Sequence, residues 1–439
     1  MRDEAVAGAE QDRGQGDDGL DVLITSIDLE ALAGANLYVR DVALGLRSAG
    51  HRPTVYSPRL GSLADELEAG GIRVLHDLGR LEAPPDVALV NQTVQAYEVA
   101  LRFPPAPIVF VSHGPLAWMA EPPRLDAVQI FVAVGSATEE RLRDAGIPED
   151  VLRLVPNGVD TARFRSSGRA LPARPRRALV FSNNAAEVGW ASLVRTACEQ
   201  RGIDLDVRGR GVGEPLRRPE DVLPSYDLVF ARGRCAREAL ACGCGVVLMD
   251  VEGMATLVGP EDVVRYNGGA FGSASFTRAH DVDAIGAEID RFEPELVRGA
   301  SDLLRQIGSL ETMVSRLIEC LREATSGNSD RSPDPTADLS ALLGYLPTLS
   351  TLGLERDEVL LARHLLHEHA VHLEQRVNVA EPALVEARAE LAAAREQLVA
   401  AGDELEALQG TRVVRARDTA LGAGRVGTAL RSLYRPFRR

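Results

Sequence analysis

The chain has 439 residues, of which 45% are hydrophobic and 26% are charged, and its formal net charge is −15. This balance is typical of a soluble globular protein with room for about three domains, and it excludes wholesale disorder. The acidic charge argues against nucleic-acid binding, so no nucleic-acid partner is expected. All 49 basic residues are Arg, so a side-chain contact with phosphate would come from Arg, His or a neutral donor.

The N-terminal stretch 1–19 is acidic and has no apolar segment. It is predicted to be a disordered leader and not a secretory signal. The chain has no run of about 18 apolar residues, so no membrane-spanning helix is expected. These features predict a cytoplasmic protein.

A first domain is predicted over residues 20–165. It begins with the apolar run Leu20–Thr25, which has the length of a strand. Apolar residues then recur at three- and four-residue spacing over 38–46, which is typical of an amphipathic helix. Short apolar runs and helical segments continue to alternate, which indicates a parallel sheet covered by helices on both faces.

A second domain is predicted over residues 176–325, after a basic linker that contains two prolines. The same alternation of strands and helices starts again there, and the segment 301–325 is predicted to be one long closing helix. The fold class is therefore α/β, with two tandem doubly wound, Rossmann-like domains that face a cleft, followed by a C-terminal helical region. Ligands of such domains bind at the carboxyl ends of the strands.

The C-terminal region is predicted to have three parts. Residues 326–340 have the composition of a polar linker, and residues 341–410 are predicted to be helical. Leu384, Leu391, Leu398 and Leu405 recur every seven residues, with Ala or Leu three positions further on, which predicts a coiled coil. This seam would pair with a second copy or another partner, or fold back as a hairpin within the chain.

The last part, residues 411–439, carries eight Arg and one Asp. Such a basic tail would either contact anionic lipid at the inner membrane face or remain solvated. It is the basis for expecting a peripheral membrane contact of the cytoplasmic protein.

The segment 233–247 is the most informative for chemistry. A Gly follows a strand, a short helix carries Glu238, and a second Gly precedes another strand. A carboxylate near the start of that helix can accept both hydroxyls of a ribose. The alternative is a solvated Glu that is stabilised by the helix dipole.

This segment resembles the Gly-x-x-x-x-Glu-Ala signature of glycosyltransferase family 4 and its GT-B relatives, including family 1-like members. Residues 155–164, Val-Pro-Asn-Gly-Val-Asp-Thr-Ala-Arg-Phe, resemble the family's segment at the domain junction. The family's first loop and helix are resembled by residues 34–39 with Gly50-His51. Ser112-His113-Gly114 follows a strand at a place where family members often have a His. The resemblance implies a GT-B fold, with the donor bound by the second domain and the acceptor by the first.

The resemblance also implies a set of site residues. His113 would act catalytically by orienting the donor sugar or moving a proton, although it could instead be hydrogen-bonded in its loop. Asn36 would approach the donor phosphates, and it is also suited to cap a helix. The residues expected to bind the donor are Gly34, Asn36, Asn183, Asn184, Arg210, Gly233, Arg234 and Glu238.

Two departures from the family pattern bear on the donor site. Phe230 stands where members often carry a second Glu, and the segment 182–189 replaces the Arg and Lys that grip the diphosphate. The cationic contact would then come from Arg208, Arg210 or Arg234, or the helix N-termini would hold the phosphates. The resemblance implies that no metal is needed, and the sequence has no visible metal-ligand cluster. No cofactor is expected, since the nucleotide diphosphate sugar is the donor substrate.

The resemblance implies a glycosyltransferase that moves a hexosyl or related sugar from a nucleotide diphosphate sugar to an acceptor hydroxyl, with retention at the anomeric carbon. The acceptor would be a glycan, a lipid or a small molecule, and the expected wider role is the synthesis of cell-surface glycan or glycolipid. Two other classes stay open. One is a GT-B sugar epimerase, and the other is a catalytically silent scaffold that binds a nucleotide sugar and recruits partners through its coiled coil.

Overall fold

The computed structural model describes residues 19–30, 34–104, 106–114, 121–185, 189–326, 336–347, 393–394 and 396–401. The chain divides into two compact units. One comprises Met1–His113 and Pro122–Asp338, and the other comprises Gly114–Glu121 and Leu339–Arg439. The first of these units contains both sheets that the described residues form, and the candidate site lies within it.

The first domain is built on a parallel sheet that has seven strands within the described residues. Their order is β3-β2-β1-β4-β5-β6-β7, which places β1 near the middle of the sheet. The strands are β1 (Asp21–Thr25), β2 (Arg52–Tyr56), β3 (Arg73–Leu75), β4 (Val87–Val90), β5 (Ile108–Ser112), β6 (Val128–Ala133) and β7 (Leu152–Leu154). Since β4, β5 and β6 are buried along their whole length, both of their faces are covered.

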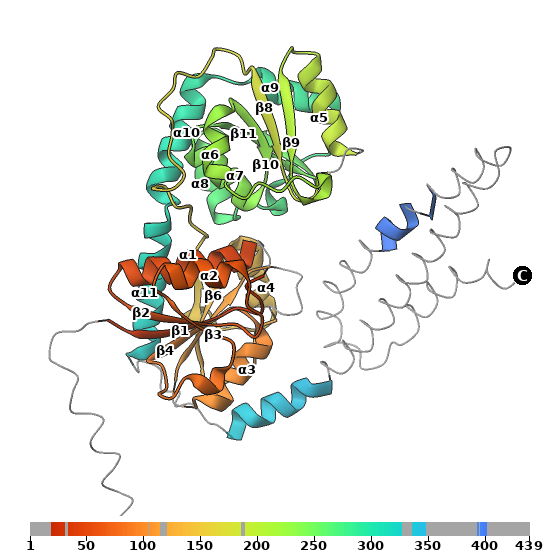
Figure 1. The fold of residues 1–439 in the computed structure, drawn as a ribbon. Helices are drawn as coiled ribbons and strands as arrows, with labels where there is room; N and C mark the ends of the chain where they lie inside the picture. The colour runs from red at the N-terminus through yellow and green to blue at the C-terminus, as the bar shows by residue number, and fades with distance from the viewer. Residues whose placement is uncertain are drawn as a thin grey trace, which may run out of the picture. The chain divides into compact units, whose positions relative to one another are not determined.

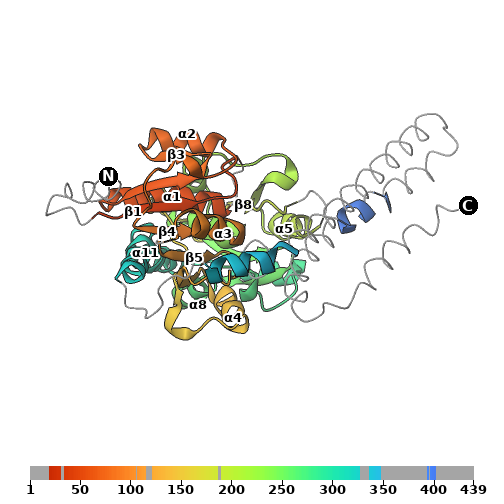
Figure 2. The same ribbon diagram turned by 90° about the horizontal axis from the view of Figure 1, so that it is seen from below.

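Helices connect these strands and cover the sheet (Figure 1). They are α1 (Gly34–Ser48), α2 (Ser62–Ala69), α3 (Thr93–Arg102) and α4 (Ser136–Asp144), with 3₁₀ turns at η1 (Leu78–Arg80) and η3 (Glu149–Val151). Apolar residues of α1 and α2 join those of the sheet in one core cluster. In Figure 2, α2 lies beside β3 at one edge of the sheet, and α4 lies at the opposite edge.

The second domain has a sheet of five strands within the described residues, in the order β12-β11-β10-β8-β9. The strands are β8 (Arg177–Phe181), β9 (Asp204–Arg208), β10 (Leu228–Ala231), β11 (Gly245–Asp250) and β12 (Gly253–Leu257). All pairs are parallel except β11 with β12. Alternate residues of the central strands enter two separate core clusters, as expected for a strand whose side chains point to opposite faces.

The helices of the second domain divide between these two clusters. They are α5 (Trp190–Glu199), α6 (Pro219–Val222), α7 (Gly233–Ala241), α8 (Pro260–Gly268), α9 (Val282–Asp290) and α10 (Pro294–Ile307), with 3₁₀ turns η4 (Arg210–Val212), η5 (Leu223–Ser225) and η6 (Ser273–Ser275). α7 and α8 pack on one face, and α5 and α9 pack on the other. Phe230 is fully buried on the face of α5 and α9, so it serves as a core residue.

The chain returns to the first domain after α10. The segment predicted as one long closing helix is two helices, because α10 ends before Gly308 and a new helix, α11 (Leu310–Thr325), begins after it. The Ser309 hydroxyl accepts a hydrogen bond from the Thr312 N–H and caps the new helix. α11 packs on α1 and on the first sheet, whereas the sequence had grouped it with the second domain over 176–325.

The chain passes between the two domains twice, near Val159 and near Ser309, and these two segments are hydrogen-bonded to each other. The Val159 N–H donates to the Gly308 carbonyl at 2.9 Å, and the Leu310 N–H donates to the Val159 carbonyl at 2.8 Å. These bonds fix the junction that carries the predicted segment 155–164. The α/β fold class with two Rossmann-like domains is confirmed.

The remaining C-terminal predictions are only partly covered. Residues 336–347 are helical, so a helix begins inside the stretch 326–340 that was predicted as a linker. Leu398 lies in the helical segment 396–401, whereas Leu384, Leu391, Leu405 and the tail 411–439 lie outside the described residues. Most of the leader 1–19 lies outside them too. Within the described part of the chain, no helix has the length and apolarity needed to cross a membrane.

Candidate active site

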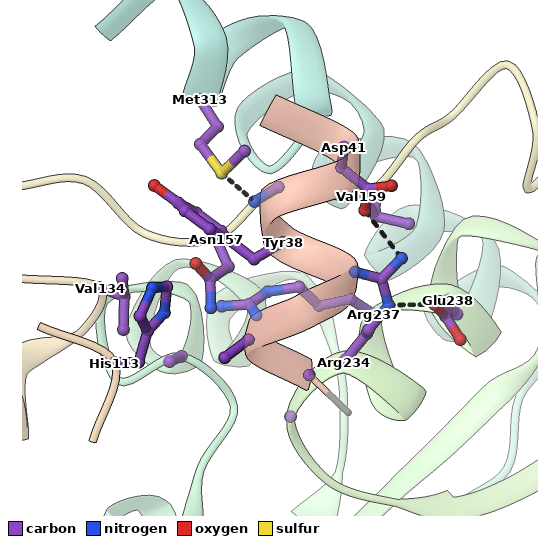
Figure 3. Close-up of a pocket in the computed structure, with 15 residues that line it drawn as sticks. Tyr38, Asp41, His113, Val134, Asn157, Val159, Arg234, Arg237, Glu238 and Met313 are labelled. Carbon is purple, nitrogen blue, oxygen red and sulfur yellow. Dashed lines mark hydrogen bonds and ion pairs between the residues drawn. The ribbon is translucent and has the colours of Figure 1, made fainter. Parts of the chain in front are cut away.

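A pocket of about 310 Å³ is lined by both domains (Figure 3). The helix α1 contributes Gly34, Ala35, Tyr38 and Asp41, and the helix α7 contributes Gly233, Arg234, Arg237 and Glu238. Connecting segments add His113 and Asn157, and α11 adds Met313. The pocket therefore lies at the cleft that the tandem domains were expected to form.

Both lining helices begin at the carboxyl end of a central strand. The helix α1 follows β1, and α7 follows β10 after a turn at Gly233. The φ angle of Gly233 is +57°, a conformation that glycine adopts without a Cβ penalty. The N-termini of two helices thus meet one pocket, where their dipoles and their first N–H groups favour a negatively charged ligand.

An ion-pair chain crosses the pocket from one domain to the other. Asp41 accepts from Arg40 at 2.8 Å through one carboxylate oxygen and from Arg234 at 2.8 Å through the other. Nε of Arg234 also donates to Oε1 of Glu238, one turn further along α7, at 2.6 Å. Figure 3 shows the Arg234 guanidinium held between the two carboxylates. We call Arg40, Asp41, Arg234 and Glu238 the ion-pair chain.

Burial and pairing shift the pKa values of the two carboxylates in opposite directions. Burial alone would raise the pKa of Asp41, but the guanidiniums of Arg234 and Arg40 outweigh it and hold the pKa below its ordinary value. For Glu238, burial outweighs its single contact with Arg234 and raises the pKa. Arg234 keeps 26% of its side chain exposed, and its pKa is raised because Asp41 and Glu238 stabilise the charged form by more than desolvation opposes it.

Arg237 differs from Arg234 although it lies one turn away on the same helix. The residue is only 2% exposed, and its Nε and Nη2 atoms have no hydrogen-bond partner among the described residues. The guanidinium lies over the ring of Phe271, 5.2 Å from its centre. Burial and the nearby Arg234 lower the pKa of Arg237 to about 9, which leaves it charged at neutral pH.

His113 follows β5 and is held from two sides. Its Nε2 lies 2.7 Å from Oδ1 of Asn91, whose Nδ2 donates to the Thr25 carbonyl. Since that amide oxygen can only accept, Nε2 carries the proton and Nδ1 is left as an acceptor. The edge of the ring meets Tyr38, with 4.6 Å between the ring centres. Burial lowers the pKa of His113 to about 4, so the side chain is neutral at physiological pH.

The structure brings five of the nine predicted site residues together in the pocket. These are Gly34, His113, Gly233, Arg234 and Glu238. Asn36 lies on α1 outside the pocket lining, and its Nδ2 donates to Asp28 Oδ1 at 3.3 Å. Arg210 is exposed in η4 and is likewise outside the lining.

Asn183 and Asn184 lie in a separate polar cluster at the carboxyl end of β8. Asn184 Nδ2 donates to Asp250 at 3.0 Å, and Ser182 donates to the other oxygen of the same carboxylate at 2.9 Å. Asn183 Oδ1 accepts from the Arg210 N–H at 3.2 Å. The side-chain groups of both residues thus organise the loop that replaces the family's cationic segment.

Sequence reasoning missed several groups that line the pocket. Tyr38 was named only within the helix over 38–46 and the segment 34–39, Asp41 was not singled out, and Arg237 was passed over beside Glu238. The available signal for Arg237 was its place next to Glu238 within the apolar pattern of Ala236, Ala239, Leu240 and Ala241. Among the described residues, no group of three His, Cys, Asp or Glu side chains could hold a metal ion.

The comparisons with known proteins agree with this architecture. Two Rossmann-like domains that share a pocket define the GT-B class of fold. Residues 32–163, which make up most of the first domain, match the family model described as Glycosyltransferase Family 4. The resemblance of the first domain to this family is thereby confirmed.

Solved structures of the Anabaena protein HepE support the same fold. The structure in complex with UDP-glucose is 17% identical and has a TM-score of 0.50, with 69% of this chain and 99% of HepE covered. The structure with UDP has 16% identity, the same TM-score and coverages of 69% and 100%. At this identity the likeness concerns the fold alone.

A further match is UDP-GlcNAc 2-epimerase from Neisseria meningitidis, solved with UDP-GlcNAc. It is 12% identical over 69% of this chain and 99% of the epimerase, with a TM-score of 0.42. This score is too low to bear on function. A comparison with curated proteins finds no match.

Proposed function

We propose that this protein is a glycosyltransferase that moves a sugar from a nucleoside diphosphate sugar to an acceptor hydroxyl. The observation that carries the proposal is the position of Glu238, a 5% exposed carboxylate in the wall of a pocket that both domains line. The match of the first domain to Glycosyltransferase Family 4 supports the reaction class.

Glu238 is arranged to bind the ribose of the donor. Its Oε1 accepts from Arg234, which leaves Oε2 to accept a ligand hydroxyl. Arg234 fixes the direction of the carboxylate because it is itself anchored to Asp41. A charge-assisted hydrogen bond of this kind contributes about 1.5–3 kcal/mol to binding.

The other pocket groups act on the sugar and on the leaving group. Nδ1 of His113 can accept a hydrogen bond from a hydroxyl of the donor sugar or from the acceptor. The N-termini of α1 and α7 face the pocket and would stabilise the negative charge that develops on the departing diphosphate. Charge stabilisation of this kind fits transfer with retention at the anomeric carbon, which we include in the proposal.

A UDP-sugar is the first donor to test, because HepE has been crystallised with UDP-glucose. The proposed reaction is hexosyl transfer without a metal or cofactor. The proposed acceptor is a glycan, a lipid or a small molecule, with cell-surface glycan or glycolipid synthesis as the wider role. The seam over 341–410 and the tail over 411–439 would serve pairing and peripheral membrane contact.

The test measures binding and turnover of UDP-glucose by the wild type and by Glu238→Gln. A ligand at 100 times its dissociation constant adds about 2.7 kcal/mol to the unfolding free energy, so thermal stabilisation reports binding. Glu238→Gln should weaken UDP binding about 10- to 100-fold. Glu261→Gln, an exposed Glu in the first turn of α8, is the matched control and should bind as the wild type does.

The outcomes separate the three function classes. A folded Glu238→Gln protein with an unchanged UDP dissociation constant contradicts the ribose contact. Release of UDP together with a new free sugar, without any acceptor, identifies an epimerase. Binding of nucleotide sugars without turnover on any acceptor identifies a silent scaffold.

A further inference from the structure

The Arg237 guanidinium is a buried cation without a counter-ion in the part of the chain that the structure describes. It is 2% exposed, and two of its three nitrogens lack any hydrogen-bond partner there. Among the described residues, its guanidinium lies over the face of Phe271, at 5.2 Å. A cation over an aromatic ring is attracted to it, but the ring accepts none of the guanidinium N–H groups in the plane of the fork.

The carboxylates that line the pocket are engaged elsewhere. Asp41 is bonded to Arg40 and Arg234, and Glu238 is bonded to Arg234. Asn157 Oδ1, which also lacks a partner among the described residues, lines the same pocket. Figure 3 shows the Arg237 side chain running behind α1 with its guanidinium directed toward Asn157. Even with its amide turned over, Asn157 carries no charge and could not neutralise the guanidinium.

A buried charge without a partner lowers the stability of a folded protein. We propose that Arg237 is the counter-ion for the phosphate groups of a nucleoside diphosphate that binds in this pocket. The planar guanidinium can grip two phosphate oxygens at once. This inference rests on the proposed function for the identity of the ligand, but its anion-binding part can be tested separately.

The location of Arg237 favours phosphate over other ligand groups. Arg237 and Glu238 both line the pocket, so a ligand whose ribose reaches Glu238 would place its phosphates within reach of the same pocket wall. The N-termini of α1 and α7 meet that pocket and favour the same charge. Arg237 would thus supply the cationic contact with phosphate for which the sequence had suggested Arg208, Arg210 or Arg234. No Lys can supply it, because this chain contains none.

The inference predicts that removing the charge has opposite effects on stability and binding. Arg237→Met keeps a long side chain and deletes the uncompensated charge. The ligand-free variant should melt at a higher temperature than the wild type. Its dissociation constant for UDP should rise about 10- to 100-fold, while that for uridine, which has no phosphate, stays unchanged. A structural arginine would show a lower melting temperature instead.

Three probes are compared: UDP, uridine and inorganic pyrophosphate. Pyrophosphate should raise the melting temperature of the wild type and fail to do so for Arg237→Met. Arg237→Gln is a second neutral variant for the case that the Met variant does not fold. It should show the same weakened binding of UDP and of pyrophosphate. Arg298→Met on α10, whose side chain is 62% exposed, is the matched control and should retain both.

Each result decides between the claims. Wild-type affinity for UDP and pyrophosphate in a folded Met or Gln variant overturns the assignment to Arg237 and leaves the proposed function standing. Pyrophosphate binding that depends on Arg237, in a protein that does not bind UDP, supports the anion site and contradicts the proposed function. A wild type that binds neither ligand overturns both.

Discussion

The two sides of the pocket differ in how their buried polar groups are paired. On one side each carboxylate of the ion-pair chain contacts a guanidinium, and the pair of Asp41 with Arg234 joins the two domains. On the other side Arg237 and Asn157 retain atoms without a partner among the described residues, and His113 presents an acceptor nitrogen. All of these residues except Arg40 line one pocket.

This difference distinguishes buried groups whose polar atoms are satisfied by other residues from buried groups that keep polar atoms for a ligand. A satisfied buried network can orient its members, since breaking one contact leaves another charge uncompensated. An unsatisfied buried group lowers stability until a ligand completes it. Under the proposed function, Asp41 and Arg234 would position the pocket groups and Arg237 and His113 would contact the substrate, while Glu238 would do both.

Asp41→Asn should have the largest effect on stability. The change leaves Arg40 and Arg234 without their shared carboxylate, and breaking a buried pair in this way costs about 3–5 kcal/mol. Urea unfolding at pH 7 measures the loss. Asp65→Asn, an exposed Asp on α2, is the control and should differ little from the wild type. A loss for Asp41→Asn as small as for the control would show that the chain does not hold the pocket.

The pH dependence of stability tests the environment of His113, on the second side of the pocket. Burial lowers the pKa of His113 in the folded protein to about 4. In the unfolded chain the imidazole has its ordinary pKa of about 6.5, so between these values it is protonated only when the chain is unfolded. The unfolding free energy should therefore fall by about 3 kcal/mol as the pH decreases from 7 to 4. Asp41 has a lowered pKa, so its stabilisation persists over this range and is lost only at still lower pH.

The variant His113→Asn removes the titrating ring and should flatten this slope. His51, whose pKa is also lowered by burial, by Arg322 and by Arg52, contributes a part that stays in both proteins. Urea unfolding at several pH values between 7 and 4 gives the two slopes, and the exposed His76→Asn is the control. Equal slopes for wild type and His113→Asn would mean that His113 is open to water in the folded protein.

Local patterns in the sequence were sufficient to predict the architecture. Apolar runs such as 20–25 and 108–111 became parallel strands, and the spacing over 38–46 became α1, because burial on both faces and helical periodicity leave direct marks in the sequence. The sequence analysis missed the break at Gly308, where α10 ends and α11 begins. A single Gly within an apolar helical pattern does not reveal that the chain there crosses to another domain.

The site was predictable only where a family pattern marked it. Glu238 and Arg234 were named from such a pattern, whereas the pairing of Arg234 with Asp41 joins residues that are far apart in sequence. The isolation of Arg237 is a tertiary property as well, since it depends on which carboxylates its neighbours occupy. Asn183 and Asn184 were placed at the donor by analogy, and their bonds within the β8 loop come from this chain's own Asp250.

The smallest effect is expected at the exposed end of the ion-pair chain. Arg40 extends the chain to Glu66 on α2, with 3.2 Å between Nη1 and Oε2, and the Glu66 side chain is 51% exposed. Glu66→Gln leaves Arg40 bonded to Asp41 and exposes the lost charge to water, so the unfolding free energy should fall by no more than about 1 kcal/mol. Because salt screens an exposed pair, the difference from wild type should shrink further between 0.1 M and 1 M NaCl, where the Debye length falls from about 10 Å to about 3 Å. Urea unfolding at both salt concentrations measures it. A loss as large as that of Asp41→Asn would show that the pairs act as one unit out to the surface, and that burial does not decide which of them holds the pocket.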